Sequence, residues 1–183
     1  ALGAVRTSVA ERLGLAKPGT YAFAWITDFP LFSFDKEENR WVSEHHPFTA
    51  PHEEDLAFLE SDPGRVRSSS YDLVVNGIEL ASGSVRIHRR DVQERVFKIL
   101  RLTPEETQER FGFFLDALQY GAPPHAGIAP GLDRLVMLIL GRSSLRDVIA
   151  FPKTQKAADL LSGAPSPVRA AQLDELHISI TKE

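Results

Sequence analysis

The sequence contains no cysteine, which excludes disulfide bonds and thiolate metal sites from any account of the fold. It also lacks an apolar run long enough to span a bilayer as a helix. Neither a Gly-x-Ser-x-Gly nucleophile turn nor a Gly-x4-Gly-Lys-Ser/Thr phosphate loop is present. The missing cysteine agrees with a reducing compartment, and we expect a cytoplasmic protein.

An excess of basic charge is missing as well. The 21 Lys and Arg residues and 25 Asp and Glu residues give a formal net charge of −4. Compact nucleic-acid-binding modules are usually basic, so the composition disfavours RNA binding by this segment alone. It does not disfavour a longer chain whose main RNA contacts lie elsewhere. Because the sequence starts at Ala1 in the middle of a pattern, we expect a fragment of such a chain.

What is present is typical of one globular domain: 183 residues, 43% of them hydrophobic and 25% charged. Hydrophobic spacing predicts helices at 2–15, 53–59, 91–100, 132–140, from Thr103 onward and in the tail after 168. Strands or extended segments are predicted at 21–34, 40–43, 66–75, 78–88, 121–130 and 148–151. Strands and helices do not alternate regularly, which favours an α+β fold with an antiparallel sheet.

Two local signals are the most specific. Asn76-Gly77 lies between two predicted strands, and both central positions of a two-residue hairpin turn need positive φ. Thr103, Pro104 and Glu106 form the pattern of a capped helix start, with the glutamate completing a capping box. We therefore predict a hairpin at the first pair and a helix N-terminus at the second.

The segment Gly131-Leu132-Asp133-Arg134 opens a nearly all-apolar helix that we expect to be buried. A helix start presents free backbone N–H groups and a positive dipole end, which suit a phosphate. Arg134 adds a fork of donors for a phosphate or a flat base. The alternative is an ordinary helix start with a solvated Asp-Arg pair, which the local pattern alone favours.

Glu79 and Arg86 lie seven residues apart in one predicted strand, so regular alternation would put them on opposite faces. A bulge at Ser82-Gly83 would restore a common face. Glu79 could then hold a magnesium-bound phosphate, and Arg86 could bind a carboxylate with two hydrogen bonds. The alternative is a half-exposed strand whose polar residues face water.

His45 and His46 are adjacent histidines in a predicted loop. Adjacent histidines rarely reach one metal ion alone, and no partner appears at helical spacing. A mobile loop that contacts an anionic substrate fits them better. No residue is predicted to act as a nucleophile or a general acid or base.

In this order and spacing, the segments resemble the bacterial-type aspartyl-tRNA synthetases, a class II family. The matching pieces cover nearly the whole chain: 25–32, 45–49, 71–79, 83–88, 112–114, 121–125, 127–135, 146–153 and 163–167. The resemblance implies an antiparallel sheet flanked by helices and a homodimer. It also implies an enzyme that converts L-aspartate and ATP to aspartyl-adenylate, then transfers the aspartyl group to tRNA(Asp), with tRNA(Asn) left open. No membrane partner is expected.

The resemblance also assigns roles. It places His45 in a loop that closes over aspartate, with His46 beside it, and makes Arg86 the ligand of the substrate's side-chain carboxylate. Glu79 would hold ATP through Mg²⁺. The remaining ATP-binding residues implied are Gly131, Leu132, Asp133 and Arg134.

The resemblance divides the chain into 1–19, the end of an inserted domain, and 20–183, the C-terminal part of the catalytic domain with motif 3. Leu80-Ala81-Ser82-Gly83 departs from the family's glycine-rich run. Motifs 1 and 2 and the anticodon-binding barrel lie outside these residues, so we expect this chain alone to be inactive. Three alternatives stay open: the asparagine or lysine branch, a non-catalytic paralogue, and an amidating enzyme that makes asparagine.

Overall fold

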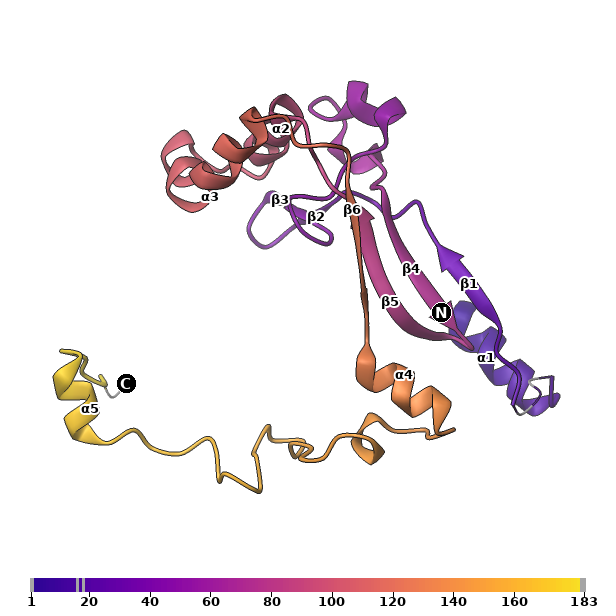
Figure 1. Ribbon diagram of the computed structural model, residues 1–183. Coiled ribbons are helices and arrows are strands. Elements are labelled where there is room, and N and C mark those ends of the chain that lie inside the picture. Colours follow the sequence, from indigo (N-terminus) through magenta and orange to yellow (C-terminus); the bar gives the residue numbers. More distant parts are fainter. Residues whose placement is uncertain (1, 16, 18, 182–183) are drawn as a thin grey trace. The chain divides into compact units, whose positions relative to one another are not determined.

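The computed structural model describes residues 2–15, 17 and 19–181 (Figure 1). Contacts divide the chain into two units, Ala1–Gly131 and Leu132–Glu183. The boundary expected at Lys17 to Gly19 includes Pro18, which lies outside the described residues, and the inserted-domain assignment stays a prediction. In the described part of the chain, no helix is long and apolar enough to cross a membrane.

A four-stranded antiparallel sheet organises the first unit. Its strands are β1 (Phe23–Ile26), β4 (Ser70–Val75), β5 (Ile78–Val85) and β6 (Ala126–Pro130), in the order β1-β4-β5-β6. The turn between β4 and β5 confirms the predicted hairpin, because Asn76 and Gly77 have φ values of 50° and 83°. The Asn76 side chain also accepts a hydrogen bond from the N–H of Ala22, at 2.8 Å.

A separate hairpin contains β2 (Phe32–Asp35) and β3 (Arg40–Ser43). The segment 21–34, predicted as a strand with its exit loop, contains two strands: β1 is followed by β2, which belongs to a different sheet. The chain changes direction at Asp28, whose φ is 61°, before Pro30. The aromatic and β-branched composition indicated a strand but not this local left-handed turn.

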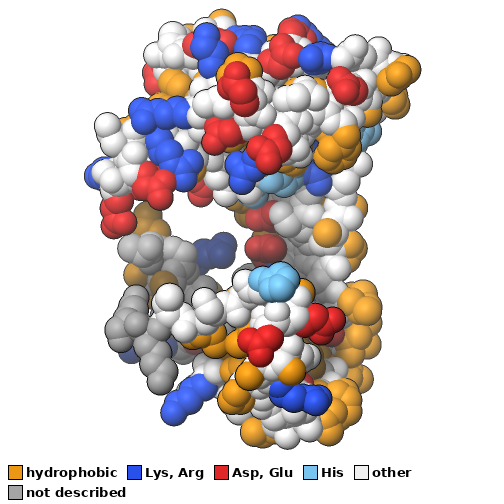
Figure 2. All heavy atoms as spheres, turned by 90° about the vertical axis from the view of Figure 1, so that its left-hand side faces the viewer, with side chains coloured by type: hydrophobic (Ala, Val, Ile, Leu, Met, Phe, Trp, Pro, Cys, Tyr) orange, Lys and Arg blue, Asp and Glu red, His pale blue; other side chains and the backbone are white. Residues whose placement is uncertain are grey.

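The helices of the first unit are α1 (Leu2–Arg12), η1 (Glu53–Phe58), η2 (Pro63–Arg65), α2 (Arg90–Ile99) and α3 (Pro104–Gln119). Figure 1 shows α2 and α3 beyond the end of the sheet at which β5 finishes. The capping box of α3 is confirmed: the Glu106 N–H donates to the Thr103 hydroxyl at 3.2 Å, and the Thr103 N–H donates to the Glu106 carboxylate at 2.9 Å. The surface of this helical part carries basic and acidic side chains side by side (Figure 2), as in the Arg90–Glu94 pair.

Two apolar clusters stabilise the first unit. One lies where β2, η2 and α2 meet and buries Leu31, Phe32, Leu59, Val66, Ile87, Val92 and Val96. The other joins α2 to α3 through Phe97, Leu115 and Leu118, with Phe48, Phe111 and Phe114 packed against them. Phe97 and Phe111 stack, with ring centroids 5.1 Å apart. Burial of such large side chains is the main favourable term that holds the helical hairpin against its loop.

The second unit contains α4 (Leu132–Ile139), η3 (Leu145–Asp147) and α5 (Ala170–Glu175). The strand predicted at 148–151 is wrong, because the segment forms turns and bends without a pairing partner among the described residues. The helix at α4 is confirmed, but its expected burial is wrong: Met137 is buried, whereas Leu132 and Ile139 are 71% and 67% exposed. An apolar pattern predicts a helix with a surface suited to burial, but it does not predict which part of a protein packs against that surface.

Candidate functional site

The pairing of β4 with β5 contains one irregularity, and it decides which face Glu79 occupies. Leu73 pairs with Ala81, but the next residue, Val74, pairs with Glu79. Leu80 is therefore the extra residue of a β-bulge. Because paired residues share a face, Glu79 lies on the face of Val74 rather than on the opposite one. The bulge thus occurs, but its predicted location is wrong.

The predicted location, Ser82-Gly83, pairs regularly with Asp72 and Tyr71. Gly83 instead allows the Gly127 carbonyl of β6 and the Tyr71 ring of β4 to approach the β5 backbone closely. A Cβ atom there would lie 2.2 Å from the Gly127 carbonyl oxygen and 2.6 Å from the Tyr71 ring. Tyr71 crosses this position and donates its hydroxyl to the Gly127 carbonyl at 3.0 Å. Gly83 therefore lets β4, β5 and β6 meet closely beneath the site.

One face of this sheet carries most of the polar side chains of β4 and β5. The cross-strand pairs Ser70–Ser84 and Asp72–Ser82 lie on it, followed by Glu79 beyond the bulge. Asp72 was missed by the sequence analysis. Its Oδ1 atom is buried and has no hydrogen-bond partner among the described residues. Period-two spacing from Ser70 is the signal that could have identified it, since a buried, unpaired carboxylate oxygen is costly unless a ligand meets it.

Arg86 continues β5 at the edge of this face. Its backbone N–H donates to the His125 carbonyl at 2.9 Å, which fixes the backbone beside β6. In the side chain, Nη1 donates to the Ser84 hydroxyl at 2.7 Å and contacts Nε2 of His46. The structure therefore brings Arg86 and His46 together, although they lie far apart in the sequence.

Desolvation by burial lowers the pKa of His46, and the neighbouring charges of Arg86 and His45 lower it further. The imidazole is consequently neutral at pH 7 and has one lone-pair nitrogen. It can accept from Arg86 at Nε2 or from the Phe48 N–H at Nδ1, which lies 3.2 Å away. The imidazole next to the Arg86 guanidinium is thus a neutral group.

A pocket of about 140 Å³ opens beside these groups. Its lining residues are His45, His46, Thr49, Ser70, Ser82, Gly83, Ser84 and Arg86. Thr49 and Ser84 are buried, so their hydroxyls form a fixed polar floor. One guanidinium surrounded by hydroxyl groups and a histidine suits a small carboxylate, because charge-assisted hydrogen bonds are strong where water is limited.

The loop that contains His45 and His46, called the histidine loop below, is held on both sides. Before it, the Glu44 N–H donates to the Leu31 carbonyl at 3.1 Å. After it, the Ile87 N–H donates to the Phe48 carbonyl at 2.9 Å, and the Phe48 ring enters the aromatic cluster of α2 and α3. His45 is exposed and packs edge-on against Phe29 at 5.2 Å.

Gly131 lies next to the bulge, because its N–H donates to the Leu80 carbonyl at 2.8 Å. The other residues of the predicted phosphate segment, Leu132, Asp133 and Arg134, belong to the second unit. Asp133 lies in the first turn of α4, as expected for a helix start. The structure thus brings His45, His46 and Arg86 into one pocket and puts Glu79 and Gly131 beside the same bulge.

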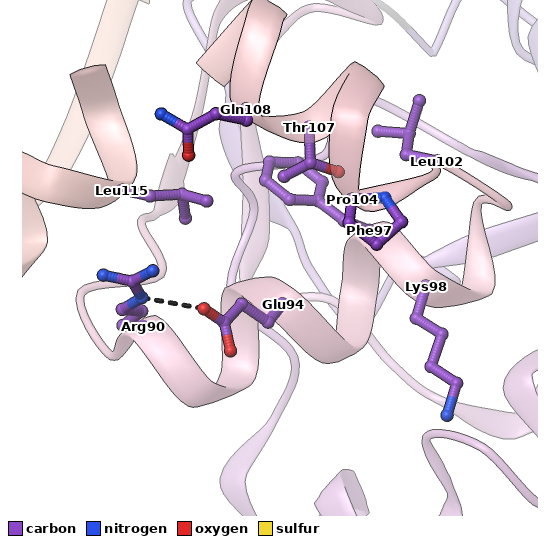
Figure 3. A pocket seen from close by; sticks show the side chains of 9 residues that line it. All are labelled: Arg90, Glu94, Phe97, Lys98, Leu102, Pro104, Thr107, Gln108 and Leu115. Carbon is purple, nitrogen blue, oxygen red and sulfur yellow. Dashed lines mark hydrogen bonds and ion pairs between the residues drawn. The ribbon is translucent and has the colours of Figure 1, made fainter. Parts of the chain in front are cut away.

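A larger pocket, of about 490 Å³, lies between α2 and α3 (Figure 3). Its charged groups Arg90 and Glu94 pair with each other at 2.7 Å, and Phe97 and Leu115 supply its apolar lining. None of the predicted site residues lines it. Arg90 and Glu94 compensate each other, and Lys98 adds one positive charge to the lining, but the described residues that line this pocket include no histidine, whereas His46 lies beside Arg86.

The side chains in the described part of the chain offer few ligands to a metal ion. No group of three or more His, Asp or Glu residues there could hold a metal ion. This excludes a site built from protein ligands alone in that part of the chain. It is consistent with Mg²⁺, which usually keeps several waters and uses one or two carboxylates together with substrate phosphates.

Comparisons with known proteins agree with one another. A profile of the family described as tRNA synthetases class II (D, K and N) matches residues 7–155. The chain is 53% identical to an aspartate–tRNA ligase of Ruminiclostridium cellulolyticum, an alignment that covers 100% of this chain and 31% of the relative. It is 57% identical to an aspartate–tRNA(Asp/Asn) ligase of Symbiobacterium thermophilum, covering 99% of this chain and 32% of the relative.

The chain therefore spans about a third of the length of these relatives. In three dimensions it is similar to an aspartyl-tRNA synthetase from Entamoeba histolytica, with a TM-score of 0.52 and 24% identity. The match covers 81% of this chain and 25% of the other. At that identity the likeness concerns the fold, and it confirms the predicted α+β class with an antiparallel sheet and flanking helices.

Proposed function

Because the chain belongs to the class II tRNA synthetases of the D, K and N group, we propose that it forms part of the catalytic domain of an aspartate–tRNA ligase. The observation that carries the proposal is the Arg86 guanidinium in a small polar pocket beside His46. In the complete enzyme, L-aspartate and ATP would give aspartyl-adenylate, and the aspartyl group would pass to tRNA(Asp) or tRNA(Asn). A homodimer and a cytoplasmic location remain predictions.

Arg86 would select the substrate. Its fork of donors matches a carboxylate, and Ser84 already holds Nη1 at 2.7 Å, which limits the rotamers available to the side chain. Asparagine has the same shape but a neutral amide, which would leave the half-buried guanidinium without a counter-charge. His46, being neutral, would complete the wall without competing for the carboxylate. His45 would contribute at the exposed rim.

ATP would lie along the polar face beyond this pocket. We assign Glu79 to Mg²⁺, and add Asp72, whose buried, unpartnered Oδ1 on the same face fits such an ion. The ion would supply charge neutralisation on the phosphates. Gly131, Leu132, Asp133 and Arg134 would contact the nucleotide, with the backbone at the start of α4 and the Arg134 guanidinium as donors.

No residue of this chain needs to act as a nucleophile. The substrate carboxylate attacks the α-phosphate, so catalysis depends on positioning and on neutralising charge. The family's motif 2 arginine lies outside these 183 residues, and we expect the chain alone to give no aspartate-dependent ATP–pyrophosphate exchange. Recruitment of tRNA would depend mainly on the rest of the enzyme.

The test is ATP–pyrophosphate exchange by the full-length enzyme with aspartate, asparagine or lysine as substrate. We expect exchange with aspartate alone, and a loss of about a hundredfold or more in kcat/KM for aspartate in Arg86→Leu, because a charge-assisted contact disappears. The matched control is Arg101→Leu, which removes an exposed arginine outside the pocket. Exchange with asparagine or lysine instead of aspartate would refute the assignment, as would an unchanged Arg86→Leu variant.

A further inference from the structure

Gln93 is a fully buried polar residue on α2, with 0% of its surface exposed. Its Nε2 donates to the Pro47 carbonyl at 2.7 Å. Its Oε1 is buried and has no hydrogen-bond partner among the described residues. A buried, unsatisfied oxygen is destabilising, so an apolar side chain of the same shape would serve packing better. The amide must therefore contribute something that packing alone does not.

What the amide contacts is the histidine loop. Pro47 follows His46 directly in the chain. Without Gln93 the Pro47 carbonyl would lose the donor that reaches it from α2. The peptide unit between Pro47 and Phe48 could then rotate, and the Phe48 N–H, which lies 3.2 Å from Nδ1 of His46, would move with it.

Other contacts also hold this loop, and one of them is at His46 itself, whose carbonyl accepts from the Thr49 N–H at 3.2 Å. The Phe48 ring is packed between α2 and α3, and the Phe48 carbonyl accepts from Ile87. None of these three contacts involves the Pro47 carbonyl, to which Gln93 donates. A hydrogen bond from a buried amide on a rigid helix can set the orientation of the peptide that follows Pro47, and hence the ring of His46 against Arg86.

We propose that Gln93 is a positioning residue of the Arg86 pocket, the proposed binding site for aspartate. It acts through Pro47 to hold His46 against Arg86, and has no contact with the substrate itself. The inference rests on the proposed function, because it assigns Gln93 to the affinity for aspartate. It makes α2 part of the substrate site, although no residue of α2 lines the pocket.

The test uses the full-length enzyme and measures KM for aspartate and for ATP in pyrophosphate exchange. Gln93→Met keeps the length of the side chain but removes the donor. We expect its KM for aspartate to rise by about tenfold, with KM for ATP within about twofold of the wild type. The matched control is Gln119→Met on α3, which removes a surface amide that donates to Asp116, and should change neither constant.

A second variant separates positioning from packing. Gln93→Glu would be ionised at high pH and would then repel the Pro47 carbonyl, but its protonated form can donate to it. Because burial raises the pKa of a carboxyl group, this switch should occur within the range in which the enzyme is stable. We expect the ratio of mutant to wild-type KM for aspartate to fall as the pH is lowered.

The possible results are distinct. If both Gln93 variants lower thermal stability and the active fraction but leave KM for aspartate unchanged, Gln93 is only a packing residue and the inference is wrong. A pH-independent defect in Gln93→Glu, or an equal rise of both KM values in Gln93→Met, would also overturn it. If the wild-type enzyme shows no aspartate-dependent exchange, the proposed function fails first.

Discussion

Replacement of Gly83 by alanine should destabilise the sheet beneath the site, and the structure allows the effect to be worked out. The added Cβ would lie 2.2 Å from the Gly127 carbonyl oxygen, 2.6 Å from Tyr71 Cε2 and 3.0 Å from Ile128 Cα. The ring can move, but two of these atoms are backbone of the paired strand. The steric clashes can therefore be relieved only if β6 moves away from β5. We expect such overpacking to lower the free energy of unfolding by about 1–3 kcal/mol.

The matched control is Gly127→Ala, on the strand opposite. A Cβ there would meet Arg86 Nη2 at 3.5 Å, which is ordinary contact. Both substitutions restrict the unfolded chain equally, by about 0.4–1 kcal/mol in favour of the folded state, so this effect cancels in the comparison. The difference between the variants isolates the collision at Gly83.

The assay is urea unfolding of the two variants, with the midpoints compared at equal slope. We expect the Gly83→Ala midpoint to fall clearly below that of Gly127→Ala. Its KM for aspartate should also rise, because Ser84 and Arg86 follow Gly83 along the same strand. Equal midpoints for the two variants would refute the close approach of β5 and β6, and with it the account of why glycine stands at this position.

Two further predictions concern carboxylates. Hydrogen bonds from Arg67 hold the pKa of Asp55 at about 2, below its ordinary 3.8, so the pair stabilises the fold above about pH 4 and loses this contribution as the pH falls toward 2. Asp55→Asn should lower stability at neutral pH and flatten the dependence on pH between those values in acid titration; an unchanged profile would contradict the pairing. Asp72→Asn should raise the Mg²⁺ concentration needed for half-maximal exchange without lowering the melting temperature, because the buried Oδ1 of this carboxylate has no hydrogen-bond partner among the described residues. A magnesium titration that matches the wild type would exclude Asp72 from the metal site.

The parts of the fold that the sequence predicted correctly are those with local causes. The Asn76-Gly77 turn depends on two residues that tolerate positive φ, and the α3 capping box depends on residues three apart. The same holds for α2, whose helical spacing lies within its own residues. In each case the groups that determine the structure are close neighbours in the chain, so their spacing can be recognised without knowledge of the fold.

The parts that were wrong depend on partners distant in sequence. The division of 21–34 into two strands follows from the separate pairing of β1 with β4 and β2 with β3. The exposure of Leu132 and Ile139 depends on what covers α4, which no pattern inside the helix encodes. The contact of His46 with Arg86 bridges forty positions. Only the family resemblance, and no local spacing, predicted that these two side chains would share a site.

The bulge illustrates how local and distant causes combine. A strand without Leu80 could have presented Glu79 on the same face by simple alternation, so the extra residue is not needed for that orientation. The Leu80 carbonyl accepts from the N–H of Gly131 at 2.8 Å, which continues the regular register of β5 with β6 beyond the pair Ala81–Pro130. The bulge thus interrupts the pairing of β5 with β4, whereas the pairing of β5 with β6 stays regular up to Gly131. A local cause, the extra residue, moves Glu79 relative to one neighbouring strand, and the distant partner on the other side keeps the strand in place.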